Sequence, residues 1–322
     1  MASLSIAVQT PRRVVWSQNK ARLYRYESAG PKRRRRIPLL VVYAPIGRPN
    51  ILDLHPGHSF VDWMRRRGLD VFLLDWGRPG IEDQALGLSG YVQDYLPAAV
   101  DAVKQIAGAR EYSMLGWSTG GLFAAIHAAL SPEGLRDLVL VTAPIDFGCR
   151  EAIPLARMVD ERWFALDRVL AGNVPGEWIA CGAMMADPMN SAVRPYRELW
   201  KHFADPEFRR HWHAMSQWAT DLVPLTGALF RDLVDLYRSD RLMRGELMIG
   251  ERCVDLRKIR ARLLNVVATD DRITPPCQSE SLLEVVGSRE KQGLRLRGTH
   301  IESMAGMRAP YESWPAIYEW LA

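Results

Sequence analysis

The chain has 322 residues, of which 48% are hydrophobic and 25% are charged. This composition is typical of a folded globular protein and excludes disordered, collagen-like and disulfide-dense chains. Its 42 Lys and Arg residues only slightly outnumber its 37 Asp and Glu residues, so the chain is mildly basic. At this length, one large domain with or without an insertion can bury about three quarters of the surface of the unfolded chain.

Much of the positive charge lies in two clusters, residues 32–36 and residues 65–67. Such clusters can contact the phosphate groups of a coenzyme, a nucleic acid or a membrane. No aromatic or recognition-helix pattern accompanies them, which favours solvated surfaces, so we expect no nucleic-acid partner. Residues 1–13 lack the apolar region of a signal peptide, and no apolar stretch approaches the ~18 residues of a membrane span. We therefore expect a cytoplasmic protein with no transmembrane segment.

The four cysteines are far apart and form no Cys-x-x-Cys pair, which favours a reducing compartment and predicts neither a zinc site nor a disulfide scaffold. They are Cys149, Cys181, Cys253 and Cys277.

The first predicted elements are two short strands, residues 13–16 and 21–27, joined by a polar turn. From residue 38 onward, apolar runs typical of buried parallel strands alternate with helical patterns. The expected strands are residues 39–43, 70–75, 112–115 and 138–142, and the expected helices are residues 59–67, 90–107 and 120–130.

The alternation stops after Pro144 for about a hundred residues, in a region with mostly helical patterns. It resumes with strands at 262–268 and 293–296 and a helix from about Tyr311. This order predicts an α/β sheet with an inserted helical cap. The expected organisation is a first core part (1–145), a cap (146–247) and a second core part (248–322).

A G-x-S-x-G motif, Gly116-Trp117-Ser118-Thr119-Gly120, lies between a predicted strand and a helix of small residues. This arrangement is typical of a nucleophile elbow. A strained backbone there projects the serine hydroxyl above the sheet, and glycines are needed because the helix and a strand pass close by.

A serine nucleophile needs a base and a carboxylate that orients the base, in the chain order Ser, acid, His. Asp271 follows the strand ending at Ala268, and His300 follows the next strand, 29 residues later. Alternatively, Asp271 caps a helix and His300 is an ordinary loop histidine. The matching order of Ser118, Asp271 and His300 favours the catalytic interpretation.

The other histidines give weaker signals. His127 lies within the helix after the elbow, where a structural role is expected. In the insertion, which also holds His202, His211-Trp212-His213 resembles a metal-binding pair but has no third ligand at a useful spacing. His55 and His58 could line a pocket or cap a helix. We therefore expect no metal site.

Several segments together resemble the catalytic domain of polyhydroxyalkanoate (PHA) synthases. They are residues 41–46, 51–54, 70–79, 217–221, 245–250, 254–256, 271–275 and 298–301. The similarity extends from about residue 38 to the C-terminus and is greatest to the shorter, two-component synthases. The resemblance implies an α/β-hydrolase fold with a cap, a separate partner subunit and a homodimer.

The resemblance also implies site residues and a substrate. Ser118 corresponds to the nucleophile, Asp271 to the orienting acid and His300 to the base. The backbone N–H groups of Thr119 and of a residue near Ile46 would form the oxyanion hole. The substrate would be a 3-hydroxyacyl thioester of coenzyme A, with no permanently bound cofactor. The sequence itself leaves open whether coenzyme A or an acyl-carrier protein carries the acyl group.

The chain departs from the family at the elbow, where Ser118 replaces the usual cysteine, and beside the acid and base, at Arg272 and Thr299. A thiol favours onward transfer of an acyl group, whereas an acyl-serine passes to water or an alcohol with the help of the base. The main prediction is therefore an acyl-Ser thioesterase, esterase or acyltransferase. The alternatives are a genuine serine-dependent PHA synthase and an inactive binding or regulatory relative.

The predicted cap is rich in tryptophan, which could form apolar walls for an acyl chain or belong to the core or a dimer interface. The residues are Trp163, Trp178, Trp200, Trp212 and Trp218.

Overall fold

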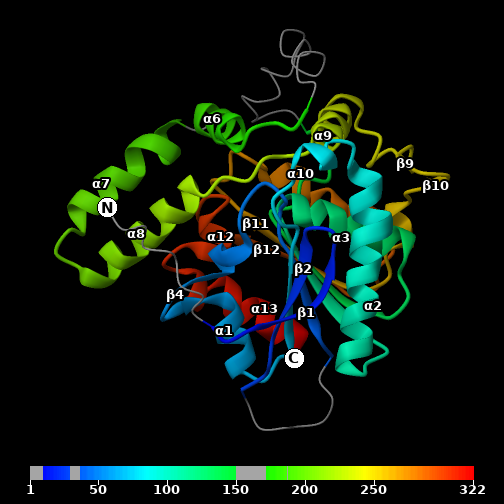
Figure 1. Cartoon of the computed structure of the whole chain (residues 1–322), viewed down its shortest axis with the longest axis horizontal. Helices are drawn as coiled ribbons and strands as arrows, with labels where there is room; N and C mark the ends of the chain where they lie inside the picture. The colour runs from blue at the N-terminus through cyan, green and yellow to red at the C-terminus, as the bar shows by residue number, and fades with distance from the viewer. Residues whose placement is uncertain (1–9, 30–36, 150–171, 187) are drawn as a thin grey trace.

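The computed structural model describes residues 10–29, 37–149, 172–186 and 188–322. An eight-stranded sheet runs through the molecule in the order β1-β2-β6-β3-β7-β8-β11-β12 (Figure 1). The first two strands pair antiparallel with each other, β2 pairs antiparallel with β6, and the remaining pairs are parallel. The strands are β1 (Arg13–Gln18), β2 (Ala21–Tyr26), β3 (Leu39–Val42), β6 (Val71–Asp75), β7 (Tyr112–Trp117), β8 (Leu135–Val141), β11 (Arg262–Ala268) and β12 (Lys291–Leu296).

Helices cover both faces of this sheet. One face packs on α1 (Phe60–Arg66), α12 (Glu302–Ala305) and α13 (Ser313–Leu321). The other face packs on α2 (Leu96–Ala107), α3 (Thr119–Leu130) and α11 (Leu282–Val285).

Side chains of β3 show why the central strands are continuous apolar runs. Leu39 and Val41 belong to the core on the α1–α13 side, and Leu40 and Val42 belong to the core on the α2–α3 side. All four are fully buried. Because successive residues of a strand point to opposite faces, a strand covered on both faces must be apolar at every position.

The observed elements agree with the predicted ones along most of the core. The short helices α10 (Pro276–Glu280), α11 and α12 were not predicted. The helix predicted at 90–107 begins as a π-helical segment, η3 (Gly90–Tyr95), before α2. A two-stranded hairpin of β4 (Asp53–His55) and β5 (His58–Ser59) was not predicted, because its strands are too short to show a period.

The segment between β8 and β11 is mainly helical in its described part. Its helices α7 and α8 extend to one side of the sheet (Figure 1). α8 packs on β4 and on the 3-10 turn η1 (Pro49–Leu52). The elements are α6 (Gly176–Ala186), η4 (Met189–Val193), α7 (Arg194–Lys201), α8 (Pro206–Thr220), α9 (Gly227–Ser239), β9 (Met248–Ile249), β10 (Arg252–Cys253) and η5 (Leu256–Lys258).

Two of the cysteines are paired, in contrast to the sequence prediction. Cys149 and Cys277 form a disulfide with their Cα atoms 6.1 Å apart, while Cys181 and Cys253 are free and exposed. The disulfide joins the start of the insertion to α10 (Pro276–Glu280). The partners are 128 residues apart, so their spacing carried no signal for the pairing.

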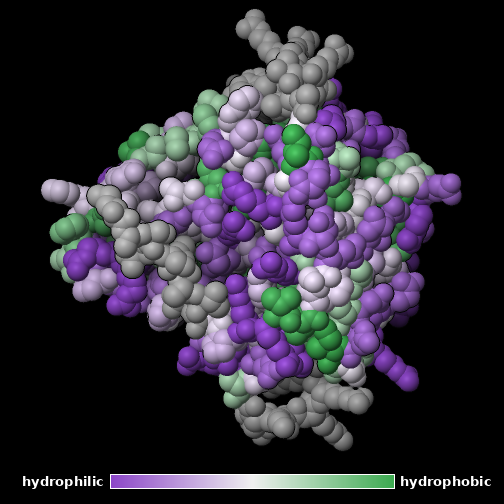
Figure 2. All heavy atoms as spheres, in the orientation of Figure 1, coloured by the Kyte–Doolittle hydropathy of each residue, from purple (hydrophilic) through white to green (hydrophobic). Residues whose placement is uncertain are grey.

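The surface that faces the viewer in Figure 2 is mainly hydrophilic. In the basic cluster at residues 65–67, Arg65 and Arg66 both pair with Asp62, and Arg67 lies 3.3 Å from the ring centre of Trp63. This cluster is a locally paired helix face. The cluster at residues 32–36 lies outside the described residues. Among the described residues, no helix is long and apolar enough to cross a membrane.

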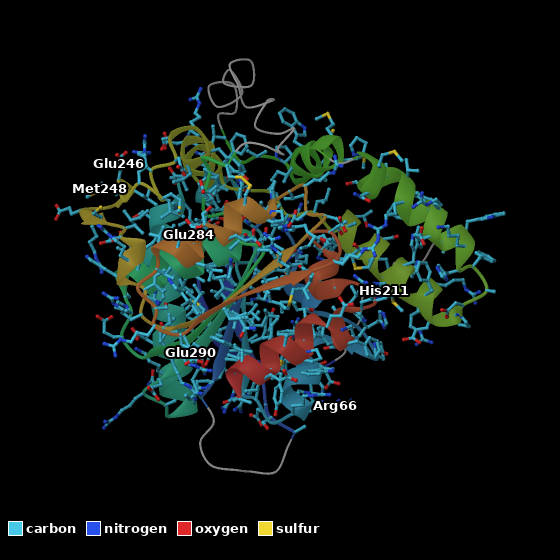
Figure 3. All side chains as sticks on the ribbon, turned by 180° about the vertical axis from the view of Figure 1, so that it is seen from behind. Arg66, His211, Glu246, Met248, Glu284 and Glu290 are labelled. Atoms are coloured by element: carbon cyan, nitrogen blue, oxygen red, sulfur yellow. A yellow bond between two sulfur atoms is a disulfide. The ribbon has the colours of Figure 1, made fainter. Side chains whose placement is uncertain are left out.

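A buried carboxylate ties three strands together near their N-terminal ends. Asp137 of β8 is fully buried, accepts a hydrogen bond from Ser113 Oγ of β7 at 2.7 Å, and pairs with Arg262 of β11 at 2.8 Å. Arg262 also pairs with Glu290, which Figure 3 labels at this end of the molecule. Asp137 therefore balances the charge of Arg262 and accepts the hydrogen bond of the buried Ser113 hydroxyl at the same time.

Replacing Asp137 by Ala should lower the free energy of unfolding by about 3 kcal/mol, because Ser113 and Arg262 lose a buried partner. Urea denaturation followed by circular dichroism measures the change. Asp101→Ala is the matched control, since that carboxylate pairs with Lys104 on an exposed face of α2 and should contribute little. Equal effects of the two substitutions would contradict the structural role of Asp137.

Candidate active site

The G-x-S-x-G motif forms the sharp turn that its sequence predicts. β7 ends at Trp117, Ser118 has φ 57° and ψ −131°, and α3 begins at Thr119. A non-glycine residue in such a conformation costs about 1–3 kcal/mol and is found mainly where function requires it. The Ser118 side chain is half-buried, at the C-terminal end of a central strand.

Two glycines of the motif are required by close approaches of the backbone. A Cβ atom on Gly116 would lie 2.6 Å from Gly121 Cα, and one on Gly120 would collide with the carbonyl oxygen of Val42. The start of α3 can therefore lie against the end of β3 only because these side chains are absent.

Asp271 and His300 form a buried pair. Asp271 follows β11, His300 follows β12, and His300 Nδ1 lies 2.7 Å from Asp271 Oδ2. The second carboxylate oxygen of Asp271 accepts the backbone N–H groups of Ile273 and Thr274, both at 2.8 Å. These bonds fix the direction of the carboxylate, and the carboxylate fixes the imidazole ring.

The hydrogen bond also determines the tautomer of His300. Because an ionised carboxylate only accepts, Nδ1 of His300 carries the proton and donates it to Asp271. Nε2 is then left with a lone pair. Tyr237 of α9 lies near this pair, and burial together with the charge of Asp271 raises its pKa to about 12, so its hydroxyl stays protonated.

Ser118 lies at the same edge of the sheet as this pair. β7, β8 and β11 are parallel neighbours, Ser118 N donates to Val141 O at 2.9 Å, and Thr142 N donates to Val266 O at 2.8 Å. The ends of the three strands are thus joined in a row. Within the described chain, the Ser118 side chain makes no hydrogen bond, so its alignment with His300 stays a prediction.

The two residues predicted for the oxyanion hole, Thr119 and Ile46, lie at the start of α3 and in the turn after β3. Thr119 is the first residue of α3, where helix N–H groups lack partners and the dipole favours negative charge. Ile46 lies in the turn that follows β3, and the residues leading to it meet Gly120. The placement is compatible with an oxyanion hole, and the role itself stays a prediction.

Helix α8 lies on the loop that carries Ile46. Trp218 Nε1 donates to Arg48 O at 2.9 Å, and Arg48 Nε lies 3.3 Å from Asp221 Oδ2. A Cβ on Gly47 would lie 3.3 Å from the Trp218 ring. A second link runs from α7, where Arg194 pairs with Glu302 at 3.1 Å, two residues after His300.

The predicted tryptophan wall is found only in part. Trp178 and Trp200 are 51% and 85% exposed, and Trp212 packs on Tyr196 within the insertion. Trp218 is the one among the described candidates that contacts the loop beside the elbow, and Trp163 lies outside the described residues.

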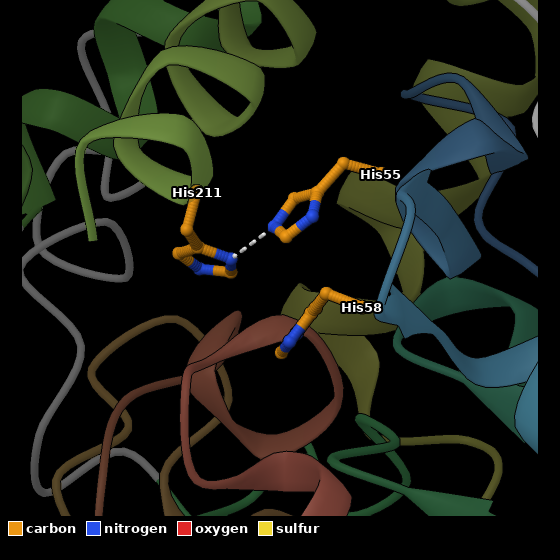
Figure 4. Close-up of side chains that lie close together, drawn as sticks. All are labelled: His55, His58 and His211. Atoms are coloured by element: carbon orange, nitrogen blue, oxygen red, sulfur yellow. Dashed lines mark hydrogen bonds between the residues drawn. The ribbon is translucent and has the colours of Figure 1, made fainter. Parts of the chain in front are cut away.

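Sequence reasoning missed two features. Thr142, at the end of β8, has φ 44° and a buried hydroxyl that lacks a hydrogen-bond partner. His211 lies against His55 and His58, about 150 residues earlier in the chain, although no third ligand was expected for it (Figure 4). The His-x-x-His spacing of residues 55 and 58 was the available signal.

His127 is buried beside the Tyr112 hydroxyl, in keeping with a structural role.

Arg48, Pro49 and Asn50 help to line a basic cavity of about 480 Å³. Its positive lining residues outnumber the negative ones, which suits an anionic group. They are Arg12, Lys20, Arg22, Arg48 and Arg78, against Asp53, Asp75 and Asp221.

The architecture is that of known hydrolases. The family model described as alpha/beta hydrolase fold matches residues 47–284. The monoacylglycerol lipase of Paleococcus ferrophilus superposes with a TM-score of 0.58 at 18% identity, covering 93% of this chain and 98% of the lipase. A hydrolase from Pseudomonas aeruginosa gives 0.59 at 16% identity, covering 97% and 98%. At these identities the structures show the fold alone.

The curated relatives are more similar in sequence. The poly(3-hydroxyalkanoate) polymerase subunit PhaC of Haloferax mediterranei is 33% identical over 98% of this chain, which spans 64% of the length of that relative. The PhaC subunit of Allochromatium vinosum is 31% identical over 97% of this chain and 88% of its own length. The chain therefore belongs to the poly(3-hydroxyalkanoate) polymerase family of α/β-hydrolase-fold proteins.

Proposed function

We propose that the protein is a serine-dependent PHA synthase, which extends a polyester by transferring 3-hydroxyacyl groups through Ser118. The observation that carries this proposal is the buried Asp271–His300 pair at the same sheet edge as the strained Ser118, in a chain 31% identical to a polymerase subunit over 97% of its length. This favours the synthase alternative over the hydrolase that the elbow residue alone suggested.

In the first step, Ser118 Oγ attacks the thioester carbonyl carbon, and His300 Nε2 takes the hydroxyl proton. The C–S bond then breaks, and His300 returns the proton to the leaving thiolate. The imidazolium formed in between is stabilised by Asp271, which is already held by two backbone N–H groups.

In the second step, a hydroxyl group attacks the acyl-Ser ester and gives its proton to His300 Nε2. The new ester bond forms, the bond to Ser118 Oγ breaks, and the proton returns to the serine. When the attacking hydroxyl belongs to a hydroxyacyl chain, each cycle adds one unit to a polyester.

Hydrolysis is the second candidate, because Ser118 makes an oxygen ester that water attacks with the same base. A product of free hydroxy acid would then replace the polyester. An inactive regulatory relative is disfavoured, because a chain without catalysis has no use for the strain at Ser118 or the aligned Asp271–His300 pair.

The basic cavity supports an acyl donor that carries phosphate groups, such as coenzyme A. Arg22 lines it, is exposed, and has no carboxylate partner in the described part of the chain. Arg48 lines the cavity and lies two residues after Ile46, so phosphates bound in the cavity are compatible with a thioester near the elbow.

The expected homodimer and partner subunit remain proposals, supported by apolar side chains on the insertion. Most of the exposed large hydrophobic residues in the described part of the chain lie there, between positions 178 and 203. A surface of this kind is typical of a covered interface. The residues are Trp178, Met184, Met185, Met189, Val193, Tyr196, Trp200 and Phe203.

Replacing Ser118 by Ala should lower both coenzyme A release and polymer formation from 3-hydroxybutyryl-coenzyme A by about 10⁴-fold, because the acyl acceptor is lost. Ser118→Cys should retain polymer formation, since a thiolate at the elbow can use the same base. Thiol release and polymer length are measured in parallel.

Ser239→Ala, on the surface of α9, is the control. Undiminished polymer from the Ala variant would overturn the role of Ser118, and free hydroxy acid without polymer would favour the hydrolase.

Replacing Arg22 by Ala should raise KM for the coenzyme A thioester about 10-fold, through loss of a charged hydrogen bond to phosphate. KM for the N-acetylcysteamine thioester of the same acyl group should stay unchanged, because that donor carries no phosphate. Arg110→Ala, on a separate exposed surface, provides the comparison. A parallel rise in KM for both donors would contradict a phosphate-binding role.

A further inference from the structure

Three histidines from distant parts of the chain converge at the junction of α8 and the core. His55 comes from β4, His58 from β5 and His211 from α8. Each is at most 7% exposed, and one ring nitrogen from each lies within 4.8 Å of the other two. His55 Nε2 and His211 Nδ1 are 3.2 Å apart (Figure 4). Figure 3 shows His211 where the α7–α8 region meets the body of the molecule.

Backbone carbonyls orient two of the rings, and each of these rings keeps one nitrogen with a free lone pair. His55 Nδ1 lies 3.0 Å from Pro56 O, and His58 Nε2 lies 3.1 Å from Ala305 O. A carbonyl oxygen only accepts, so these nitrogens carry the ring protons. The opposite nitrogens, His55 Nε2 and His58 Nδ1, are therefore unprotonated. Metal-binding histidines are typically oriented by this kind of hydrogen bond from their second nitrogen.

Burial keeps the three imidazoles neutral. It lowers the pKa of His58 to about 4 and that of His211 to about 3, with a smaller lowering at His55, and the neighbouring histidines add to the effect at His58 and His211. Only one hydrogen bond joins the three rings, between His55 and His211. The hydrogen-bonding nitrogens of three neutral imidazoles therefore cannot all be paired with one another. A cation with nitrogen ligands would use all three lone pairs.

We propose that His55, His58 and His211 bind one divalent transition-metal ion, with Zn²⁺ as the best match, and that this ion fastens α8 to the β4–β5 hairpin. Three imidazoles without a carboxylate suit zinc and its neighbours and disfavour Mg²⁺ and Ca²⁺. Ligand nitrogens around tetrahedral zinc lie about 3.4 Å apart, given Zn–N bonds of about 2.1 Å. At 3.2 Å, the His55 Nε2–His211 Nδ1 distance is already close to this spacing.

Binding requires two small adjustments. His58 moves toward the other rings until all ligand nitrogens are about 3.4 Å apart. His211 transfers its proton from Nδ1 to Nε2, which frees the nitrogen that faces His55. No net proton is released, and a water molecule supplies the fourth ligand.

The site would act on the position of α8 and not on the chemistry. α8 carries Trp218 and leads into Asp221, and both hold the Arg48 loop beside the turn at Ile46. The ion would therefore anchor the helix that covers this loop. This inference does not depend on the proposed function, because metal binding is measured directly.

Metal binding is tested with the full chain, without a histidine tag, after treatment with EDTA and its removal. Titration with Zn²⁺ followed by calorimetry should show one ion per chain and a rise in the unfolding temperature. Co²⁺ should give the visible absorption of a tetrahedral nitrogen site. His211→Ala should weaken Zn²⁺ binding at least 100-fold, whereas His213→Ala, an exposed histidine on the same helix, should not change it.

A second variant, His55→Gln, guards against misfolding, and circular dichroism of each metal-free variant checks that the fold is retained. Loss of binding in both folded variants supports the site. Stoichiometric binding that survives both substitutions would overturn it, as would the lack of any Zn²⁺ binding by the wild-type chain.

Discussion

The strained turn at Ser118 is the constraint on which the rest of the active-site architecture depends. It exists because α3 approaches β3 and β7 so closely that Gly116 and Gly120 admit no side chain. The cost of the turn is offset by the core around β7 and α3, whose residues are almost all fully buried. A rigid elbow places the serine hydroxyl beside the first N–H groups of α3. Asp271 and His300 follow β11 and β12, which lie two and three strands from β7 and end at the same side of the sheet.

Polar contacts link α7 and α8 to this edge, whereas Leu229, Leu236 and Leu242 of the insertion are buried in the main core. Arg194 reaches Glu302 beside His300, Asp221 reaches Arg48, and Trp218 donates to the Arg48 carbonyl. Exposed ion pairs of this kind contribute little free energy each.

Much of the core and the elbow could be predicted from the sequence, because buried parallel strands are continuous apolar runs and the G-x-S-x-G motif is local. The order of Ser118, Asp271 and His300 was also readable, and the structure joins the last two by a hydrogen bond. Contacts between distant segments were not readable. The approach of His211 to His55 depends on how α8 packs on β4, and the Cys149–Cys277 disulfide joins positions with no characteristic spacing.

The central claim is that hydroxyacyl groups pass through Ser118 into a polyester. Intact-protein mass spectrometry after incubation with 3-hydroxybutyryl-coenzyme A tests it most directly, with peptide mapping to locate the modified residue. The account predicts a ladder of adducts on Ser118 that differ by one hydroxybutyryl unit. A single adduct with accumulating free hydroxy acid would contradict polymerisation, and adducts on any other residue would contradict the role of Ser118.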